Sequence, residues 1–330
     1  MIKIAINGFG RIGRLSLRYL LQFDNVRVVA VNDLAPVETL AHLFTFDSVH
    51  GVFSGDVKSE EGAMLINGQR INVYEERSPE NLPWADLGVD IVLECTGIFR
   101  TREKMALHQK AGAKKVLLSA PGDKDVPMFV MGVNDEGLTA DLDMVSNASC
   151  TTNCLAPMVK VLDDTFGVVK GYMTTVHAYT ADQRLLDAPH KDLRRARSAA
   201  VSMVPTTTGA AKAMGRILPH LAGKLDGMAV RVPTSNVSFT DLTVVLNKEV
   251  TAEEINAVMK TAAEGSMKGI IHFETRPLVS VDLNGHEASC IFDAELTSAQ
   301  GSLVKVCGWY DNEYGYAARL GDMAIKMGQL

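Results

Sequence analysis

The chain has 330 residues, of which 47% are hydrophobic and 22% are charged, and its formal net charge at pH 7 is -6. This length accommodates two domains with separate cores, and no apolar run approaches the roughly 18 residues of a membrane-spanning helix. The negative charge disfavours nucleic acid and anionic lipid as partners, so any anion the chain binds must meet a local basic cluster.

The five cysteines are odd in number and include no Cys-x-x-Cys pair. This pattern disfavours a disulfide framework and a zinc knuckle and is typical of a reducing compartment. The apolar run within the first eight residues is too short for a signal peptide, and it ends in Asn7-Gly8, which is typical of a turn, rather than in a cleavage site. We therefore expect a cytoplasmic protein without a metal site.

The first predicted element is an isoleucine-rich strand at residues 3–7, followed by Gly8-x-Gly10-x-x-Gly13 and a helical pattern of leucines. A lone glycine motif of this kind is weak evidence, because it also occurs in ordinary turns. Here it lies between a strand and a helix, as a Rossmann dinucleotide site requires. The glycines then let the backbone approach a pyrophosphate, and the helix N-terminus stabilises its charge.

A second apolar strand at residues 26–31 ends at Asn32-Asp33, and Asp33 lies 20 residues after Gly13. An acidic residue at this strand tip binds ribose hydroxyl groups in Rossmann domains. Its carboxylate would also repel a 2′-phosphate. Asp33 therefore favours NAD over NADP as the cofactor.

The first half continues as alternating strands and helices. Asn67-Gly68 between two apolar runs indicates a hairpin. A strand at residues 89–95, a helical pattern at 102–111 and a strand at 115–118 follow. These two strands end at Thr96-Gly97 and at Ser119. Because strand ends at one edge of a parallel sheet line the ligand crevice, Thr96, Gly97 and Ser119 are cofactor candidates. The alternative is that they are ordinary turn residues.

Cys150 stands in Ser149-Cys150-Thr151-Thr152, directly before an apolar helical stretch, and His177 follows at the end of the next predicted strand. A helix N-terminus and a nearby histidine can lower the pKa of a thiol and produce the nucleophilic thiolate. The alternative, a small buried filler, does not explain the hydroxyl groups on both sides. Cys150 is therefore predicted to be a covalent catalyst with His177 as its base, whereas Cys154 is predicted to be a core residue.

The second half is predicted to be an α+β domain with a mainly antiparallel sheet covered on one face. Strands are expected at residues 168–178, 228–232, 237–246 and 302–310, and helices at 210–214 and 253–264. A helical pattern at 317–330 could return to the first domain. The predicted fold is thus an α/β Rossmann domain of residues 1–149 and 313–330 with a catalytic domain of residues 150–312.

A loop between these strands is locally cationic, with five basic and three acidic residues between positions 182 and 197. Arginine suits phosphate because its fork offers two donors at once. Thr206-Thr207-Thr208-Gly209 precedes a helix and offers further donors, and Arg231 ends a strand. Two phosphate sites are predicted, although a solvated face or a subunit interface would also explain the charged loop.

These motifs together resemble phosphorylating glyceraldehyde-3-phosphate dehydrogenases over the whole length of the chain. The resemblance is carried by residues 6–14, 146–154, 177–197, 206–212, 231–234 and 309–313. It implies a glycolytic oxidoreductase that converts D-glyceraldehyde 3-phosphate and inorganic phosphate to 1,3-bisphosphoglycerate with reduction of NAD. Cys150 would form a hemithioacetal and then a thioester, with His177 as the base.

The resemblance also implies roles for other residues. The substrate and phosphate ligands would be Thr180, Arg195 and Arg231, with Ser149, Thr151, Thr208 and Gly209 as donors to the attacking phosphate. The cofactor contacts implied in this way are Arg11, Ile12, Asp33, Arg77, Ser119, Asn312 and Tyr316, in addition to Gly8, Gly10, Thr96 and Gly97 from the glycine motif and the strand ends. For these contacts the alternatives are core or loop roles. A homotetramer is implied, and no nucleic acid or membrane partner is indicated.

One position departs from the family pattern. Strictly NAD-dependent members usually carry leucine where Ala188 stands, and this leucine helps to exclude a 2′-phosphate on the adenosine of a neighbouring subunit. With Asp33 retained, NAD remains the expected cofactor. Ala188 adds the hypothesis of some NADP use.

Two other functions remain open from the sequence. Erythrose-4-phosphate dehydrogenases share the fold and the nucleophile but favour water over phosphate as the acyl acceptor. A non-catalytic NAD-binding interaction protein would carry Cys150 only as an oxidisable thiol. The run of hydroxyl donors at Ser149, Thr151 and Thr206–Thr208 favours the phosphorylating reaction.

Overall fold

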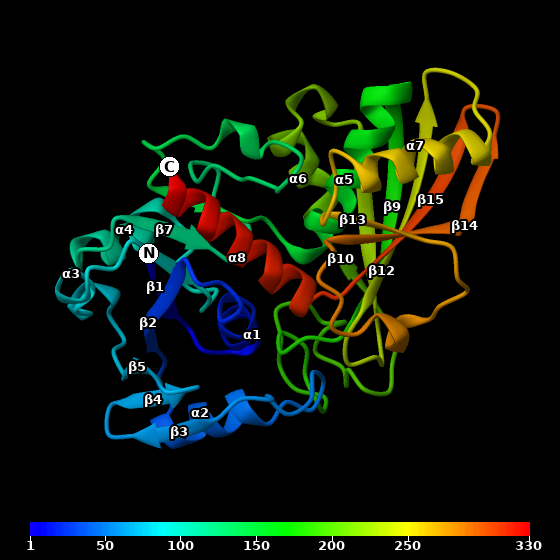
Figure 1. Cartoon of the computed structure of the whole chain (residues 1–330). Coiled ribbons are helices and arrows are strands. Elements are labelled where there is room, and N and C mark those ends of the chain that lie inside the picture. Colours follow the sequence, from blue (N-terminus) through cyan, green and yellow to red (C-terminus); the bar gives the residue numbers. More distant parts are fainter. The chain divides into compact units, whose positions relative to one another are not determined.

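The structure is a computed structural model that describes all residues from 1 to 330. The chain divides into two compact units. Unit 1 comprises residues 1–129, 137–148 and 317–330, and unit 2 comprises residues 130–136 and 149–316. Figure 1 shows the elements of both units coloured in chain order. No helix combines the length and the apolar character that crossing a membrane requires.

Unit 1 contains an eight-stranded sheet with the order β3-β4-β5-β2-β1-β6-β7-β8. The strand pairs from β5 through to β8 are parallel, and β3, β4 and β5 form an antiparallel extension at one edge. The strands are β1 Ile2–Asn7, β2 Val26–Asn32, β3 Val57–Glu60, β4 Ala63–Ile66, β5 Gln69–Tyr74, β6 Ile91–Glu94, β7 Lys115–Leu118 and β8 Met144–Ser146.

The predicted hairpin at Asn67-Gly68 is confirmed, since it joins β4 to β5 and both residues have positive φ. The helices of unit 1 are short. They are α1 Arg11–Leu20, α2 Val37–Thr45, α3 Trp84–Leu87 and α4 Arg102–Lys110. Thr101 begins α4 by accepting a hydrogen bond from the Lys104 amide, which satisfies one of the free N–H groups of the first turn.

Unit 2 contains a seven-stranded sheet with the order β10-β11-β9-β12-β15-β14-β13. Four of its strand pairs are antiparallel, and β11–β9 and β13–β14 are parallel. The predicted fold, a Rossmann domain with a mainly antiparallel catalytic domain, is therefore confirmed. The strands are β9 Val168–Ala178, β10 Val204–Thr207, β11 Leu225–Val232, β12 Ser238–Leu246, β13 Ile271–Glu274, β14 Cys290–Gln300 and β15 Leu303–Tyr310.

Three helices belong to unit 2: α5 Cys150–Phe166, α6 Ala210–Ile217 and α7 Ala252–Glu264. Helix α5 packs on β9, β12, β14 and β15, whereas α6 and α7 pack on strands near opposite edges. A capping box between Thr251 and Glu254 begins α7, in which each side chain satisfies the other residue's backbone N–H. The sheet thereby buries one face under helices.

The last helix, α8 Tyr314–Gln329, returns the end of the chain to unit 1. The Tyr19 hydroxyl donates to Asp322, and the Lys115 ammonium donates to the Met327 carbonyl. Most of this helix, from residue 317 onward, therefore belongs to unit 1.

Candidate active site and cofactor cradle

Cys150 is the first residue of α5, as the sequence predicts. Ser149 begins the helix with extended backbone angles, and its hydroxyl accepts a hydrogen bond from the Thr152 amide at 3.2 Å. The first-turn N–H groups of a helix have no acceptor within the helix and carry the positive end of its dipole. The sulfur of Cys150 therefore lies where negative charge is stabilised.

His177 lies next to the sulfur and is oriented as a base. Its Nε2 atom is 3.5 Å from the Cys150 Sγ atom, and its Nδ1 atom is 2.7 Å from the Ala178 carbonyl oxygen. Because a carbonyl only accepts, Nδ1 carries the proton and donates it. The lone pair on Nε2 is thus directed at the thiol of Cys150.

The pKa values of this pair correct one expectation from the sequence. Burial raises the pKa of the Cys150 thiol above its usual value, although Arg231 and the N–H and hydroxyl of Thr151 act in the opposite direction. Burial, aided by the Arg231 charge, lowers the pKa of His177 to about 3. The predicted lowering of the thiol pKa is therefore wrong for this structure, because loss of solvent outweighs the helix terminus.

Both shifts favour the neutral forms, in which a protonated thiol faces an unprotonated imidazole. From these forms, the thiol proton has to leave as the sulfur attacks. His177 is positioned to accept it, because Nε2 already faces the thiol. This is general-base activation of a nucleophile.

The hydroxyl of Tyr310 connects the elements that carry the two groups. It lies 2.8 Å from the Thr151 hydroxyl on α5 and 2.8 Å from the Thr175 hydroxyl on β9. The Tyr310 ring also packs edge-on against the imidazole of His177. This buried junction holds the start of α5 against the end of β9, and with it the separation of Cys150 from His177.

Arg231 lies beside His177 in register on the neighbouring parallel strand, β11. Its Nη1 atom donates to the Ala178 carbonyl at 3.1 Å and to the Thr180 hydroxyl at 3.2 Å, whereas its buried Nε atom has no partner. A half-buried guanidinium with an unused donor is suited to an anion. Burial lowers the pKa of Arg231.

Replacing this cation is expected to change the reactivity of the thiol. In Arg231→Met the pKa of Cys150 is expected to rise further, because the nearest positive charge is lost. Alkylation of the protein by iodoacetamide, followed against pH, would show its midpoint at higher pH. Arg197→Met is the matched control, because Arg197 is 68% exposed and pairs with Asp187 at the surface. An unchanged midpoint in Arg231→Met would disprove the electrostatic role.

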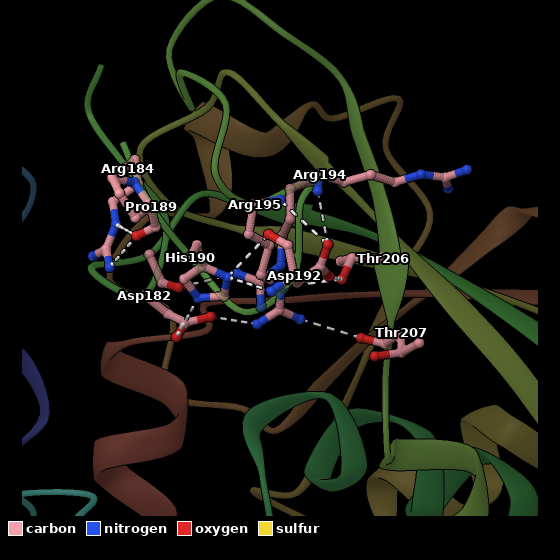
Figure 2. A network of polar contacts seen from close by, with 11 residues as sticks. Asp182, Arg184, Pro189, His190, Asp192, Arg194, Arg195, Thr206 and Thr207 are labelled. Atoms are coloured by element: carbon pink, nitrogen blue, oxygen red, sulfur yellow. Dashed lines mark hydrogen bonds and ion pairs between the residues drawn. The ribbon is translucent and has the colours of Figure 1, made fainter. Parts of the chain in front are cut away.

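Arg195, another predicted anion ligand, is held by its own loop and by strand β10 (Figure 2). Its guanidinium donates to Asp182, to the Thr206 hydroxyl at 3.0 Å and to the Thr207 carbonyl at 3.2 Å. Asp182 is thus a counter-ion that the sequence analysis did not weigh. In Figure 2 the Arg194 side chain points away from this network.

Several predicted phosphate donors lie at helix starts. Ser149 begins α5, and Gly209 precedes the first residue of α6. The Thr208 hydroxyl accepts a hydrogen bond from the Ala210 amide at 3.2 Å, and a Cβ at Gly209 would meet open space. Thr151 differs from these residues, because it is buried and its hydroxyl contacts Tyr310.

Asn312 and Tyr316, both predicted to contact the cofactor, are buried residues of unit 2. The amide oxygen of Asn312 accepts a hydrogen bond from the Ser238 hydroxyl at 2.7 Å. This contact directs the amide oxygen of Asn312 toward Ser238 and its amide nitrogen away from Ser238. Their assignment to the cofactor stays a prediction.

In unit 1 the glycine motif lies at the turn between β1 and α1. Gly8 has φ of +91°, and a Cβ there would lie 2.7 Å from the Thr96 amide nitrogen. Only glycine fits this turn without displacing backbone. Gly10 precedes the first residue of α1 and has open space beside it, so the first-turn amides of this helix are accessible.

Asp33 lies at the tip of β2 beside this turn. One carboxylate oxygen accepts a hydrogen bond from the Phe9 amide at 2.7 Å, and the other lies 3.3 Å from the Ala35 amide. The carboxylate is therefore held in a fixed position beside the glycine turn. This is the position from which an acidic residue contacts ribose hydroxyl groups in a Rossmann domain.

A cleft of about 440 Å³ opens at this edge of the sheet. Of the predicted cofactor residues, Gly8, Gly10, Asp33, Arg77 and Thr96 line it. The other lining residues were not predicted to be part of the site; they are Asn7, Asn32, Leu34, Glu76, Cys95, Ile98 and Phe99. Asn7, Asn32 and Cys95 end or follow parallel strands, so the strand-end rule could have found them.

Besides Asn312 and Tyr316 of unit 2, four predicted cofactor residues of unit 1 do not line this cleft. Arg11 forms a bidentate ion pair with Asp47, with distances of 2.5 and 3.1 Å, and Ile12 lies in the first turn of α1. Gly97 has positive φ next to Thr96, and the Ser119 amide donates to the Glu94 carbonyl. Their assignment to the cofactor remains a prediction.

A Rossmann unit with a dinucleotide cradle, together with a mainly antiparallel unit that carries a thiol–imidazole pair, is the combination found in dinucleotide-dependent dehydrogenases with a cysteine nucleophile.

Comparisons with known proteins specify the family. Residues 2–102 match the family model described as glyceraldehyde 3-phosphate dehydrogenase, NAD binding domain, and residues 149–312 match the C-terminal domain of the same enzyme. The chain is 54% identical over 330 residues to the plasmid-encoded glyceraldehyde-3-phosphate dehydrogenase of Cupriavidus necator, covering 99% of this chain and 98% of the relative. It is 55% identical over 325 residues to the enzyme of Geobacillus stearothermophilus, covering 98% and 97%.

The chain therefore belongs to the glyceraldehyde-3-phosphate dehydrogenase family. It is an NAD-dependent oxidoreductase, and the resemblance read from its motifs is confirmed.

Proposed function

We propose that this chain catalyses the glycolytic oxidation and phosphorylation of D-glyceraldehyde 3-phosphate to 1,3-bisphosphoglycerate, with Cys150 as the nucleophile and His177 as the base. The observation that carries the mechanism is the 3.5 Å separation of the Cys150 sulfur from an imidazole nitrogen whose lone pair faces it. The overall reaction is inferred from membership of the family, and the first step is inferred from the geometry of the thiol and the imidazole.

In that step the sulfur adds to the aldehyde carbon while its proton passes to Nε2 of His177. The carbonyl oxygen becomes an oxyanion. The N–H groups at the start of α5 and the newly protonated imidazole are its donors, and each donor of this kind contributes a few kcal/mol to stabilising a transition state. The product is a hemithioacetal on Cys150.

Oxidation then removes a hydride from the carbon of the hemithioacetal, and the oxyanion collapses to the carbonyl of a thioester. Bound NAD supplies the hydride acceptor. The cofactor would be held at its pyrophosphate by the Gly8–Gly10 turn and the α1 terminus, and at a ribose by Asp33. The fixed Asp33 carboxylate and the accessible helix start are suited to a dinucleotide.

The last step is the attack of inorganic phosphate on the thioester carbon, which releases the Cys150 sulfur and forms the acyl phosphate. Two anion sites would orient the reactants. Arg231 and Thr180, with Arg195, would bind one phosphate group, and Ser149, Thr151, Thr208 and Gly209 would donate to the other. The unpartnered Nε atom of Arg231 supports an anion at the first site.

A single assay tests this function against its nearest alternative. The purified protein is mixed with glyceraldehyde 3-phosphate and NAD, and absorbance of the reduced cofactor is followed with and without inorganic phosphate. Turnover is expected to depend on phosphate. Turnover that is equal without phosphate, and faster with erythrose 4-phosphate, would instead favour an erythrose-4-phosphate dehydrogenase.

Cofactor choice gives a separate prediction at Ala188. This residue is exposed, and its amide donates to the Ala196 carbonyl. The short side chain is expected to permit weak use of NADP, so Ala188→Leu should lower kcat/KM for NADP and leave kcat/KM for NAD unchanged. Absence of NADP turnover by the unmodified chain at millimolar cofactor would reject this expectation.

We also propose that the chain is a cytoplasmic homotetramer. Five large apolar side chains of the 185–203 region are more than 70% exposed, and Tyr172 on β9 is 72% exposed. Apolar surface of this extent is typical of an interface between proteins. Light scattering should therefore give four times the chain mass of 35.7 kDa, and a monomer mass would contradict the proposal.

A further inference from the structure

A fully buried carboxylate, that of Glu94, lies at the end of β6 behind the cofactor cleft of unit 1. One of its oxygens accepts from the Asn7 amide nitrogen at 2.6 Å and contacts Nε2 of His108 at 3.0 Å. The other accepts from the Thr96 amide at 2.8 Å and contacts the Thr96 hydroxyl. None of these contacts has a role in the mechanism described above.

Groups that do not themselves touch Glu94 determine which atoms of His108 and Asn7 donate to its carboxylate. The indole N–H of Trp84, which can only donate, lies 3.1 Å from Nδ1 of His108. Nδ1 is therefore the acceptor, and the proton of the neutral ring is on Nε2, which donates to Glu94. Trp84 thus selects the tautomer of His108.

A second chain of hydrogen bonds reaches Glu94 from the other side. The Glu76 amide donates to the side-chain oxygen of Asn32 at 2.9 Å, which leaves the Asn32 nitrogen to donate to the oxygen of Asn7 at 2.7 Å. The Asn7 nitrogen must then face Glu94. Both chains of hydrogen bonds consequently end by donating to one carboxylate oxygen, an arrangement that only an acceptor satisfies.

The residues held in this way form the wall of the cleft. Asn7, Asn32, Glu76 and Thr96 all line it. Asn7 directly precedes Gly8, and the backbone of Gly8 packs so closely on Thr96 that a Cβ would lie 2.7 Å from the Thr96 nitrogen. The Glu94 carboxylate therefore binds the strand ends on both sides of the glycine turn.

We propose that Glu94, with His108 as its tautomer-selected donor, is a positioning residue for the dinucleotide cradle: it holds Asn7 and Thr96 in the arrangement that the cofactor requires. The proposal rests on the assignment of this cleft to the cofactor. It attributes affinity for NAD to two residues that do not touch the cofactor. Both are fully buried and contribute nothing to the surface of the cleft.

The test compares NAD dissociation constants, measured by calorimetry below the onset of unfolding. In Glu94→Gln the new amide NH₂ group faces either the Asn7 and His108 donors or the Thr96 amide, whichever way the side chain is turned. The dissociation constant of NAD is therefore expected to rise about tenfold or more. His108→Gln can accept from Trp84 and donate to Glu94, and should stay within about threefold of the unmodified chain. His108→Leu loses both contacts and should resemble Glu94→Gln.

Two further measurements separate positioning from general destabilisation. The rate at which Cys150 is alkylated reports on unit 2 and should not change in these variants. Glu274→Gln is the matched control, because Glu274 is also a buried glutamate at the last residue of a strand, but in unit 2. It should leave the dissociation constant of NAD unchanged.

A lower melting temperature for Glu94→Gln with an NAD dissociation constant within about twofold would overturn the proposal. If Glu94→Gln does not fold, equal affinities of His108→Gln and His108→Leu would overturn it. Asp33→Ala distinguishes this failure from a wrong cofactor site. Weak binding in Asp33→Ala with normal binding in Glu94→Gln removes only the positioning role, whereas normal binding in both rejects the cleft assignment as well.

Discussion

Cys150→Ser is expected to lower kcat/KM at least about a thousandfold, because a serine hydroxyl at this position is a much weaker nucleophile than the sulfur. Binding of NAD should not change, since Cys150 is not among the residues predicted to hold the cofactor and does not line the cleft. Steady-state kinetics and calorimetry on the same preparation would check both statements.

Cys154→Ser is the matched control for this substitution. Cys154 lies on the same helix, is fully buried, and its sulfur contacts the Gly308 carbonyl at 3.7 Å. A serine hydroxyl can donate to the same carbonyl, so activity should stay within about tenfold. Full activity in Cys150→Ser would remove the covalent mechanism and leave a non-catalytic NAD-binding role as the alternative.

His177→Asn is expected to reduce kcat by about a hundredfold to ten-thousandfold, the range typical of losing a general base. The loss should appear in the acylation step, because the proton of the thiol has no acceptor once Nε2 is gone. Rapid-mixing measurements of the first turnover would resolve that step. His220→Asn is the control, since His220 is 58% exposed and pairs with Asp163 outside the site.

The pH dependence of alkylation follows from the same pair. His177, with a pKa of about 3, is unprotonated throughout the range from about pH 5 to about pH 8. The pKa of Cys150 is raised, so the rate of alkylation in the cofactor-free protein should rise steadily with pH across that range. An inflection near the ordinary pKa of histidine that disappears in His177→Asn would show instead that the imidazole titrates there.

The sequence identified more of the fold than of the geometry of its sites. The predicted strand at residues 168–178 is β9 to the residue, and the glycine turn, the Asn-Gly hairpin and the helix that begins at Cys150 are as expected. These elements are determined locally, by glycine at positive φ, by side-chain caps and by hydrophobic periodicity. Strands β13 and β14 were not predicted, although β14 forms an antiparallel hairpin with the next strand, β15.

The identities of the reacting groups were also accessible from the sequence, since Cys150, His177 and Asp33 stand in motifs whose residue types indicate their chemistry. Only the tertiary structure decided their state. Arg231 reaches Cys150 through pairing of β11 with β9, and burial raises the pKa of the thiol that the local motif predicted to be low. Arg195 forms an ion pair with Asp182. Glu94 accepts hydrogen bonds from Asn7 on β1 and His108 on α4, which are remote from it or from each other in sequence. Local sequence specifies which groups are available, whereas desolvation and hydrogen-bond direction depend on what the fold packs around them.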